Sequence, residues 1–244
     1  MASSAFNSFE TNVRELKRIY LDASLGATLP SLDQSELARA FSALAHAEIE
    51  YFLEKIFEDL SREVMKQAAA GRYISSSLAL LTYSNIEQLA AGQKLLSGKA
   101  EKRIIAKRLG EAFGKYSDSL SENHGVREKY LAKLAIPMGL SGDLIDPTWI
   151  SDLEAFCDRR GAVAHRGRHD ADAAPAGFNP TDIWRKCDTL IWGNPALPPG
   201  LIASFREIDD WVTDQKAIFS QQTLGPPAAA AFTIWDRIKR FILG

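Results

Sequence analysis

The sequence predicts an all-α protein, a helical bundle with a C-terminal helical extension. Apolar residues recur at the three- and four-residue spacing of a helix face through most of the 244 residues. No segment keeps the strict alternation of a half-buried strand. Glycine and proline separate the periodic segments. Because 46% of the residues are hydrophobic and 25% are charged, the chain can bury a substantial core among these helices.

The first half of the chain contains four expected helices. The motif Ser31 to Gln34 has the form of a capping box, which predicts the start of the second and longest helix. The segment 26–30 ends the helix before it, and Gly71 ends the long helix itself. We expect helices over residues 8–23, 33–69, 74–96 and 100–120.

The second half continues the same pattern with shorter helices. Residues 139–147 and 169–180 are rich in turn-forming residues and are expected to be loops. We expect helices over residues 126–136, from Trp149 onward, and over 181–192, 201–221 and 232–243. We therefore predict a helical domain over 1–222, followed by a Pro- and Ala-rich linker and an amphipathic helix over 223–244.

Bulk properties exclude several classes of protein. The formal net charge of −2 gives no overall attraction to nucleic acid, so such binding would need a local basic patch. Cys157 and Cys187 form neither a disulfide framework nor a metal-type spacing. The first residues lack a secretory signal, and no apolar run is long enough to cross a bilayer. We expect a cytoplasmic protein that does not enter the membrane.

One stretch, from Trp149 to Gly167, combines helical periodicity with reactive residues. Arg160 falls on the same helical face as the apolar Phe156 and Val163. A guanidinium is rarely placed there without an anionic partner. Five residues later comes His165, whose side chain titrates near neutral pH. Phosphodiester cleavage needs one group that holds a phosphate and one that moves a proton, and these two types fit.

The segment Arg160-Gly-Ala-Val-Ala-His165-Arg-Gly resembles the Arg-x4-6-His signature of the HEPN (higher eukaryotes and prokaryotes nucleotide-binding) superfamily. Residues 43–54 are similar to the early helix of its RiboL-PSP-HEPN branch, and residues 130–153 to the lead-in of the motif. The resemblance extends in order over about 35–190. It departs at Gly161, where the family usually has Asn, so a role of that Asn side chain is not carried over. The preceding Arg159 also permits a spacing of five, but Arg160 aligns better.

The resemblance implies metal-independent RNA cleavage that uses no cofactor. His165 would take the proton from a ribose 2′-OH or give one to the 5′-oxygen, and Arg160 would bind the scissile phosphate. On an ideal helix these two positions lie about 140° apart. Either the helix ends or bends near 161–167, or the site is composite. Family members bring two motif copies together by dimerisation, and we expect the same homodimer here.

Other residues are candidates for supporting the site or binding RNA. His46 and Glu48 lie on the long helix, where Glu48 falls on the apolar side and is either buried against Arg160 or part of a structural ion pair. His165 and His169 have a spacing that can bind zinc, but no third ligand is evident, so we expect no metal. The supporting or RNA-binding candidates are Arg159, Gly161, Arg166, Arg168, His169, Glu48 and His46.

Two classes of function fit this sequence. The first is an endoribonuclease acting as a toxin or anti-phage defence effector, with an antitoxin or sensor protein as a further partner. The second is a non-catalytic module that binds nucleotide, RNA or a protein partner. The presence of both Arg160 and His165 favours the first class, and Gly161 favours the second.

Overall fold

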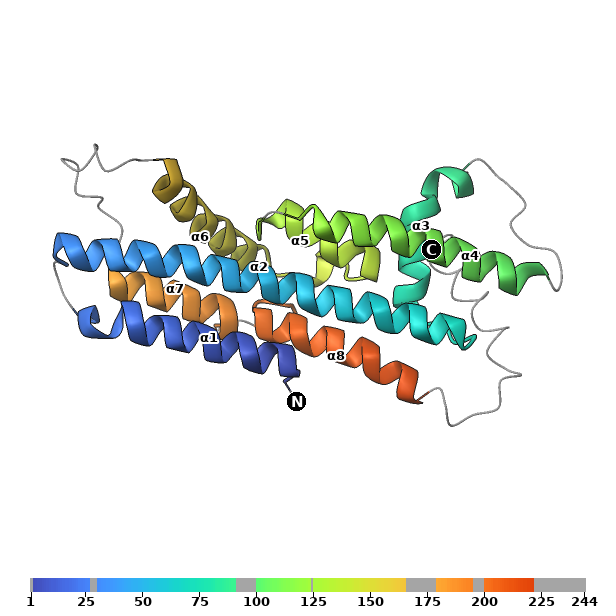
Figure 1. Ribbon diagram of the computed structural model, residues 1–244, viewed down its shortest axis with the longest axis horizontal. Coiled ribbons are helices and arrows are strands. Elements are labelled where there is room, and N and C mark those ends of the chain that lie inside the picture. The colour runs from blue at the N-terminus through green and yellow to red at the C-terminus, as the bar shows by residue number, and fades with distance from the viewer. Residues whose placement is uncertain are drawn as a thin grey trace.

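The computed structural model describes residues 2–26, 30–90, 100–123, 125–165, 179–194 and 200–221 (Figure 1). For residues 85–90, 100–106, 159–165 and 219–221 it describes the helix backbone only. Within these ranges the regular structure is helical, apart from one isolated bridge between Ile145 and Ile202. None of the helices in these ranges is long and apolar enough to cross a membrane.

The structure confirms the all-α prediction. The α-helices are α1 (Ser4–Tyr20), α2 (Leu32–Ala69), α3 (Ser75–Ala90), α4 (Ala100–Ser121), α5 (Glu128–Ala135), α6 (Pro147–His165), α7 (Pro180–Trp192) and α8 (Phe205–Gln221). Three short 3₁₀ helices, Asp22–Ser24, Ile136–Met138 and Gly142–Leu144, lie between them.

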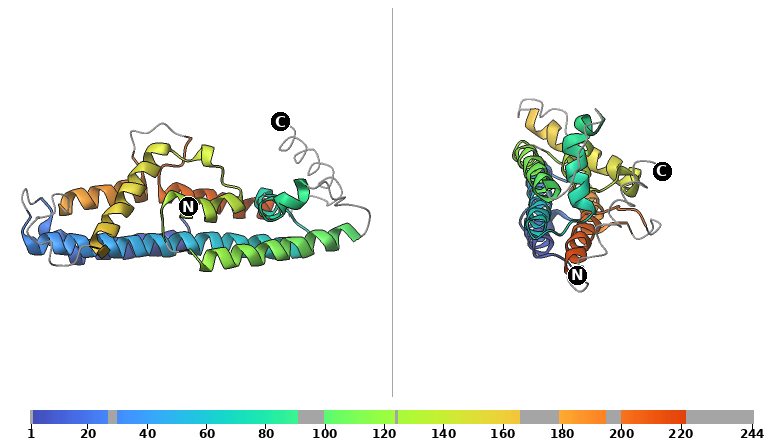
Figure 2. Two further views of the ribbon diagram at one scale, coloured as in Figure 1. Left: turned by 90° about the horizontal axis from the view of Figure 1, so that it is seen from above. Right: turned by 90° about the vertical axis from the view of Figure 1, so that its right-hand side faces the viewer.

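Helix α2 is the axis of the bundle. Its 38 residues span about 57 Å at the rise of an α-helix. Helices α1, α7 and α8 lie on one side of it, and α3, α4, α5 and α6 lie on the other (Figures 1 and 2). All seven pack directly against α2. The molecule is therefore elongated, with its core distributed along both flanks of one helix.

An aromatic cluster joins four helices at the centre of the bundle. The rings of Phe9 on α1 and Phe52 on α2 stack with centroids 4.6 Å apart. Phe205 on α8 meets both of these rings edge to face. Trp149 on α6 packs edge to face on Phe205 at 5.2 Å, and its indole Nε1 donates to the carbonyl of Leu190. Buried aromatic pairs in these geometries stabilise a core by more than the burial of their apolar area alone. This cluster therefore holds the four helices in fixed positions relative to one another.

Helix caps decide where the expected helices begin. The Ser31 capping box is confirmed, because Ser31 Oγ accepts from Gln34 N and Gln34 Oε1 accepts from Ser31 N. Helix α1 begins at Ser4, earlier than expected, because Ser3 Oγ accepts from Phe6 N. From the sequence alone, the start was expected at residue 8, where apolar residues begin to recur at helical spacing.

Helix α8 begins later than expected, at Phe205 instead of Leu201. Ile202 is taken up by the backbone bridge to Ile145, and Ser204 Oγ then accepts from Glu207 N as a cap. The expected 223–244 extension and the end of the expected third helix lie outside the described residues, as does the boundary between the two predicted domains.

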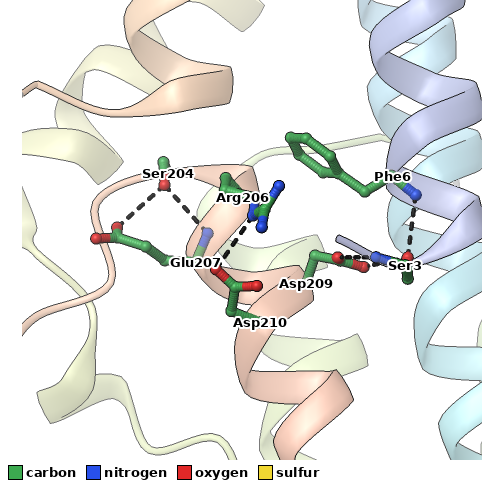
Figure 3. Close-up of polar contacts among 7 residues, drawn as sticks. All are labelled: Ser3, Phe6, Ser204, Arg206, Glu207, Asp209 and Asp210. Carbon is green, nitrogen blue, oxygen red and sulfur yellow. Dashed lines mark hydrogen bonds and ion pairs between the residues drawn. The ribbon is translucent and has the colours of Figure 1, made fainter. Parts of the chain in front are cut away.

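A buried carboxylate ties the two ends of the chain's helical domain together. Asp209 on α8 is fully buried and accepts hydrogen bonds from both the backbone N and the Oγ of Ser3 (Figure 3). The same Oγ caps α1 through Phe6 N. Arg206 lies over the Phe6 ring at 5.2 Å and its Nε donates to Asp210. Since a buried charge needs hydrogen-bond partners, the start of α1 is held against α8.

We predict that Ser3→Ala lowers the free energy of unfolding by roughly 1–3 kcal/mol, because it removes the α1 cap and one bond to the buried Asp209. Urea denaturation followed by circular dichroism measures this change. The matched control is Ser8→Ala at an exposed position of α1, which is expected to change stability by less than about 0.5 kcal/mol. Equal effects of the two substitutions would contradict a structural role for the Ser3–Asp209 contact.

Candidate functional site

The motif helix α6 is anchored at its first turn by a segment far away in the sequence. Asp146 Oδ1 accepts from Trp149 N at 2.9 Å and caps the helix. Asp146 N donates to Ile202 O at 2.9 Å, and Ile202 N donates to Leu144 O at 2.7 Å. The start of α6 is therefore held by the segment that leads into α8.

The middle of α6 is held on two sides. Its inner side buries Leu153, Phe156 and Cys157. On its outer side, Arg127 before α5 bonds Glu154 at 3.0 Å and Asp158 at 2.6 Å. The hydrogen bond to Asp158 raises the pKa of the Arg127 guanidinium above its ordinary value. Asp158 lies two residues before Arg160, so this clamp holds α6 directly before the motif.

The backbone of α6 is helical through positions 160 and 165. Position 160 lies on the same side of the helix as the buried Phe156 and Cys157, at four- and three-residue spacing. Position 165 lies about 140° further round an ideal helix. Because α6 has no break between the two positions, one helix does not bring both to the same side.

The other candidates around the motif are described less fully. Arg159 and Gly161 belong to the helical backbone of α6. Arg166, Arg168 and His169 lie outside the described residues. The supporting or RNA-binding roles expected of these residues stay predictions.

A polar cluster lies on the side of α2 that faces α4, α5 and α6. His46 is 2% exposed, and its Nδ1 lies 3.8 Å from Glu50 Oε2 one turn later. Glu54, a further turn along the same side, accepts at 2.9 Å from Asn123 Nδ2 at the end of α4. Helical spacing puts His46 and Glu50 on the same side of α2 as Glu54, which contacts the end of α4. Helix α6 also packs against α2 and lies on the same side of it as α4 (Figure 1).

Glu48 lies on the opposite flank. Its carboxylate is half-buried and accepts from Asn12 Nδ2 on α1 at 2.9 Å. This contact directs Glu48 toward α1. The role of Glu48 in the site stays a prediction. The sequence analysis grouped His46 with Glu48 because the two residues are close in the chain. A separation of two residues rotates the side-chain direction by about 200° around a helix, so the two side chains point to opposite sides of α2.

Two further polar residues share the flank of His46 and were not singled out from the sequence. Arg39 is half-buried and bonds Glu36 Oε1 at 2.8 Å. Ser42 is fully buried, and its Oγ has no hydrogen-bond partner among the described residues. The signal was present in the sequence, because polar residues at positions 39, 42 and 46 recur at helical spacing inside an apolar stripe.

This flank of α2 supplies an imidazole, a carboxylate and a guanidinium. Such groups can orient a phosphate-binding arginine or a proton-transferring histidine through hydrogen bonds and charge. The buried thiol of Cys187 on α7 is not part of it, and burial raises the pKa of that thiol far above its usual range. Among the described residues no three His, Cys, Asp or Glu side chains are grouped as metal ligands.

Comparison with known proteins connects this geometry to a family. No curated protein and no solved structure matches the chain. The family model of the RiboL-PSP-HEPN domain matches residues 7–191, a range that runs from α1 through the motif helix α6 to the end of α7. Helix α8 follows the matched range and completes the bundle. The chain therefore belongs to the RiboL-PSP-HEPN family.

Proposed function

We propose that this protein is a metal-independent endoribonuclease of the HEPN type. The supporting observation is that the matched family range includes α6, and α6 carries both Arg160 and His165 in the Arg-x4-6-His pattern. The family commonly acts on RNA, and the two side-chain types suit phosphate binding and proton transfer.

In the proposed reaction, the ribose 2′-oxygen attacks the adjacent phosphorus and the bond to the 5′-oxygen breaks. His165 takes the proton from the 2′-OH, or gives one to the leaving 5′-oxygen. Arg160 binds the scissile phosphate and stabilises the additional negative charge of the pentacoordinate transition state. The products are a 2′,3′-cyclic phosphate and a 5′-OH end. DNA is not cleaved, because it lacks the attacking hydroxyl.

The site is proposed to be composite. Positions 160 and 165 lie on different sides of one uninterrupted helix, so a single copy does not direct both toward one phosphate. Two copies related by a twofold axis can pair an arginine from one motif with a histidine from the other. The buried His46 and its neighbour Glu50 support the motif helix from the α2 flank.

The biological role is proposed to be that of a toxin or anti-phage defence effector that acts on cytoplasmic RNA. An uncontrolled ribonuclease harms its own cell, so an antitoxin or sensor protein would restrain it. The non-catalytic alternative, a module that binds nucleotide, RNA or protein, draws its support from Gly161 in place of the usual Asn.

The first test of this function is RNA cleavage by purified protein in excess EDTA. We expect the wild type to cleave RNA but not DNA of the same sequence, and to leave cyclic phosphate ends. His165→Ala is expected to lower the rate by about 10²–10⁴-fold, the usual contribution of a positioned acid or base. Equal cleavage by wild type and variant would rule out the assignment of His165.

A second prediction compares two glutamates on the opposite flanks of α2. Glu50→Gln is expected to lower the RNA cleavage rate by roughly tenfold or more, because it removes the charge beside buried His46 on the flank that packs against α6. Glu48→Gln is the matched control. Its amide keeps an acceptor for Asn12 on α1, and its cleavage rate is expected to stay within about twofold of wild type. A larger loss in Glu48→Gln than in Glu50→Gln would show that the wrong flank was chosen.

A third prediction separates the two functional classes in cells. Expression of the wild-type chain is expected to arrest growth, whereas Arg160→Ala, produced to the same level, is not. The readout is colony formation together with total RNA integrity. Growth arrest by both chains with intact RNA would favour the binding module over the ribonuclease.

A further inference from the structure

Two carboxylates on the outer side of the motif helix α6 bind the same arginine. Glu154 Oε2 lies 3.0 Å from Nη1 of Arg127, and Asp158 Oδ1 lies 2.6 Å from Nη2 of the same guanidinium. Glu154 Oε1 also accepts at 2.8 Å from the backbone N of Glu128, the first residue of α5. Helix α6 is therefore attached to the start of α5 by three hydrogen bonds, and the bond to Asp158 is the one nearest to the motif.

The two carboxylates contribute differently to the stability of the bundle. The side chain of Glu154 is 32% exposed and caps α5, so it joins two helices in a partly buried contact. The side chain of Asp158 is 67% exposed. An ion pair as exposed as that of Arg127 with Asp158 adds little to the free energy of unfolding. Its main consequence is local, because it restrains α6 two residues before Arg160.

The chain before Arg127 is itself fixed in place. Asn123 Nδ2 donates at 2.9 Å to Glu54 Oε1 on α2 and at 3.1 Å to the carbonyl of Gly125. Gly125 lies against the ring of Tyr130 on α5, so closely that a Cβ at this position would be 2.9 Å from two ring carbons. These contacts hold the chain before Arg127 against α2 and α5. The guanidinium therefore extends to α6 from a fixed base.

The motif extends beyond this attachment. The backbone of α6 stays helical to His165, seven residues after Asp158. On an ideal helix, position 165 lies on nearly the same side as position 158 and about 10 Å further along the axis. A tilt of α6 by about 10° at Asp158 displaces position 165 by roughly 2 Å. A misplacement of about 1 Å can already lower a reaction rate by up to about a hundredfold. The direction of the last turns of α6 therefore matters for any chemistry of the motif.

We propose that Arg127 is a positioning residue for RNA cleavage. Its bond to Asp158 fixes the direction of the last turns of α6, and so the placement of Arg160 and His165 against the scissile phosphate. Arg127 acts through the helix and does not contact RNA. This inference rests on the proposed function, because it concerns the same motif helix. A purely stabilising ion pair would act on the whole bundle, whereas a positioning contact acts on the end of α6.

Cleavage kinetics of the full chain in excess EDTA test this role. Arg127→Met is expected to lower kcat about tenfold and to leave KM within about twofold, because a displaced motif loses contacts made in the transition state. Arg127→Lys keeps a charge beside Asp158 and is expected to recover at least about threefold of this loss. The matched control is Arg62→Met, which removes a 2.7 Å ion pair with Glu58 inside α2 and is expected to keep kcat within about twofold. Circular dichroism checks that the variants keep their helices.

A double-mutant cycle tests whether Arg127 acts through Asp158. Asp158→Asn alone is expected to lower kcat about threefold or more. The double variant is expected to be no slower than Arg127→Met alone, because its ion pair is already broken. Losses that multiply in the double variant would overturn the proposal. An unchanged kcat in Arg127→Met, or an equal loss in Arg62→Met, would do the same.

Amide hydrogen exchange tests the attachment without reference to activity. In Arg127→Met, the amides of residues 159–165 are expected to exchange about threefold faster or more, while those in the middle of α2 keep the wild-type rate. Unchanged exchange at the end of α6 would overturn the proposal, and so would faster exchange throughout the bundle, which indicates general destabilisation. If the wild type does not cleave RNA, the ribonuclease is rejected together with the catalytic consequence. Faster exchange at the end of α6 then still supports the attachment by Arg127.

Discussion

The burial of α2 along its length is the constraint on which the rest of the structure depends. Among the described helices none is as long as this helix of 38 residues, so its apolar surface is covered by several shorter ones. Helices α1, α7 and α8 cover one flank and α3 to α6 cover the other. The aromatic cluster around Phe52 and the buried Asp209 fix where these shorter helices meet. The bundle is thus organised by the position of each helix along α2.

The same arrangement explains how the motif helix is placed. Its cap is held by Ile202, its first aromatic residue by Leu190, and its outer acidic side by Arg127. These anchors come from before α5, the end of α7 and the approach to α8. None of them takes part in the proposed chemistry. They hold the motif helix on the flank of α2 where α4 also lies, the side to which His46 and Glu50 belong, whereas Glu48 contacts α1.

The proposed function has one geometric difficulty to meet. Positions 160 and 165 lie about 140° apart on an uninterrupted helix, so the proposed site draws its arginine and its histidine from two copies of the chain.

Much of the fold was predictable from local pattern. The helical class, the start of α2 at its capping box and the location of the Arg-x4-6-His motif on a helix all follow from residues within a few positions of one another. The beginnings of α1 and α8 were misplaced, because their caps and bridges involve residues that carry no apolar signal. The motif of the candidate site could be predicted from the sequence, whereas the polar residues of α2 around it were predicted only in part. Arg39 and Ser42 were overlooked, and the contact of Glu48 with Asn12 on α1 was not foreseen.

The sequence by itself therefore determined that this protein is helical, where most of its helices lie and which residues carry its candidate chemistry, because helix formation and capping are local. Only the tertiary structure decided which side of α2 is core and which is exposed. It also decided that Ser3 reaches Asp209, 206 residues away. Helical periodicity records that two sides of α2 are apolar, but it does not record what covers them. That outcome depends on contacts between segments distant in the chain, and these exist only when the helices pack.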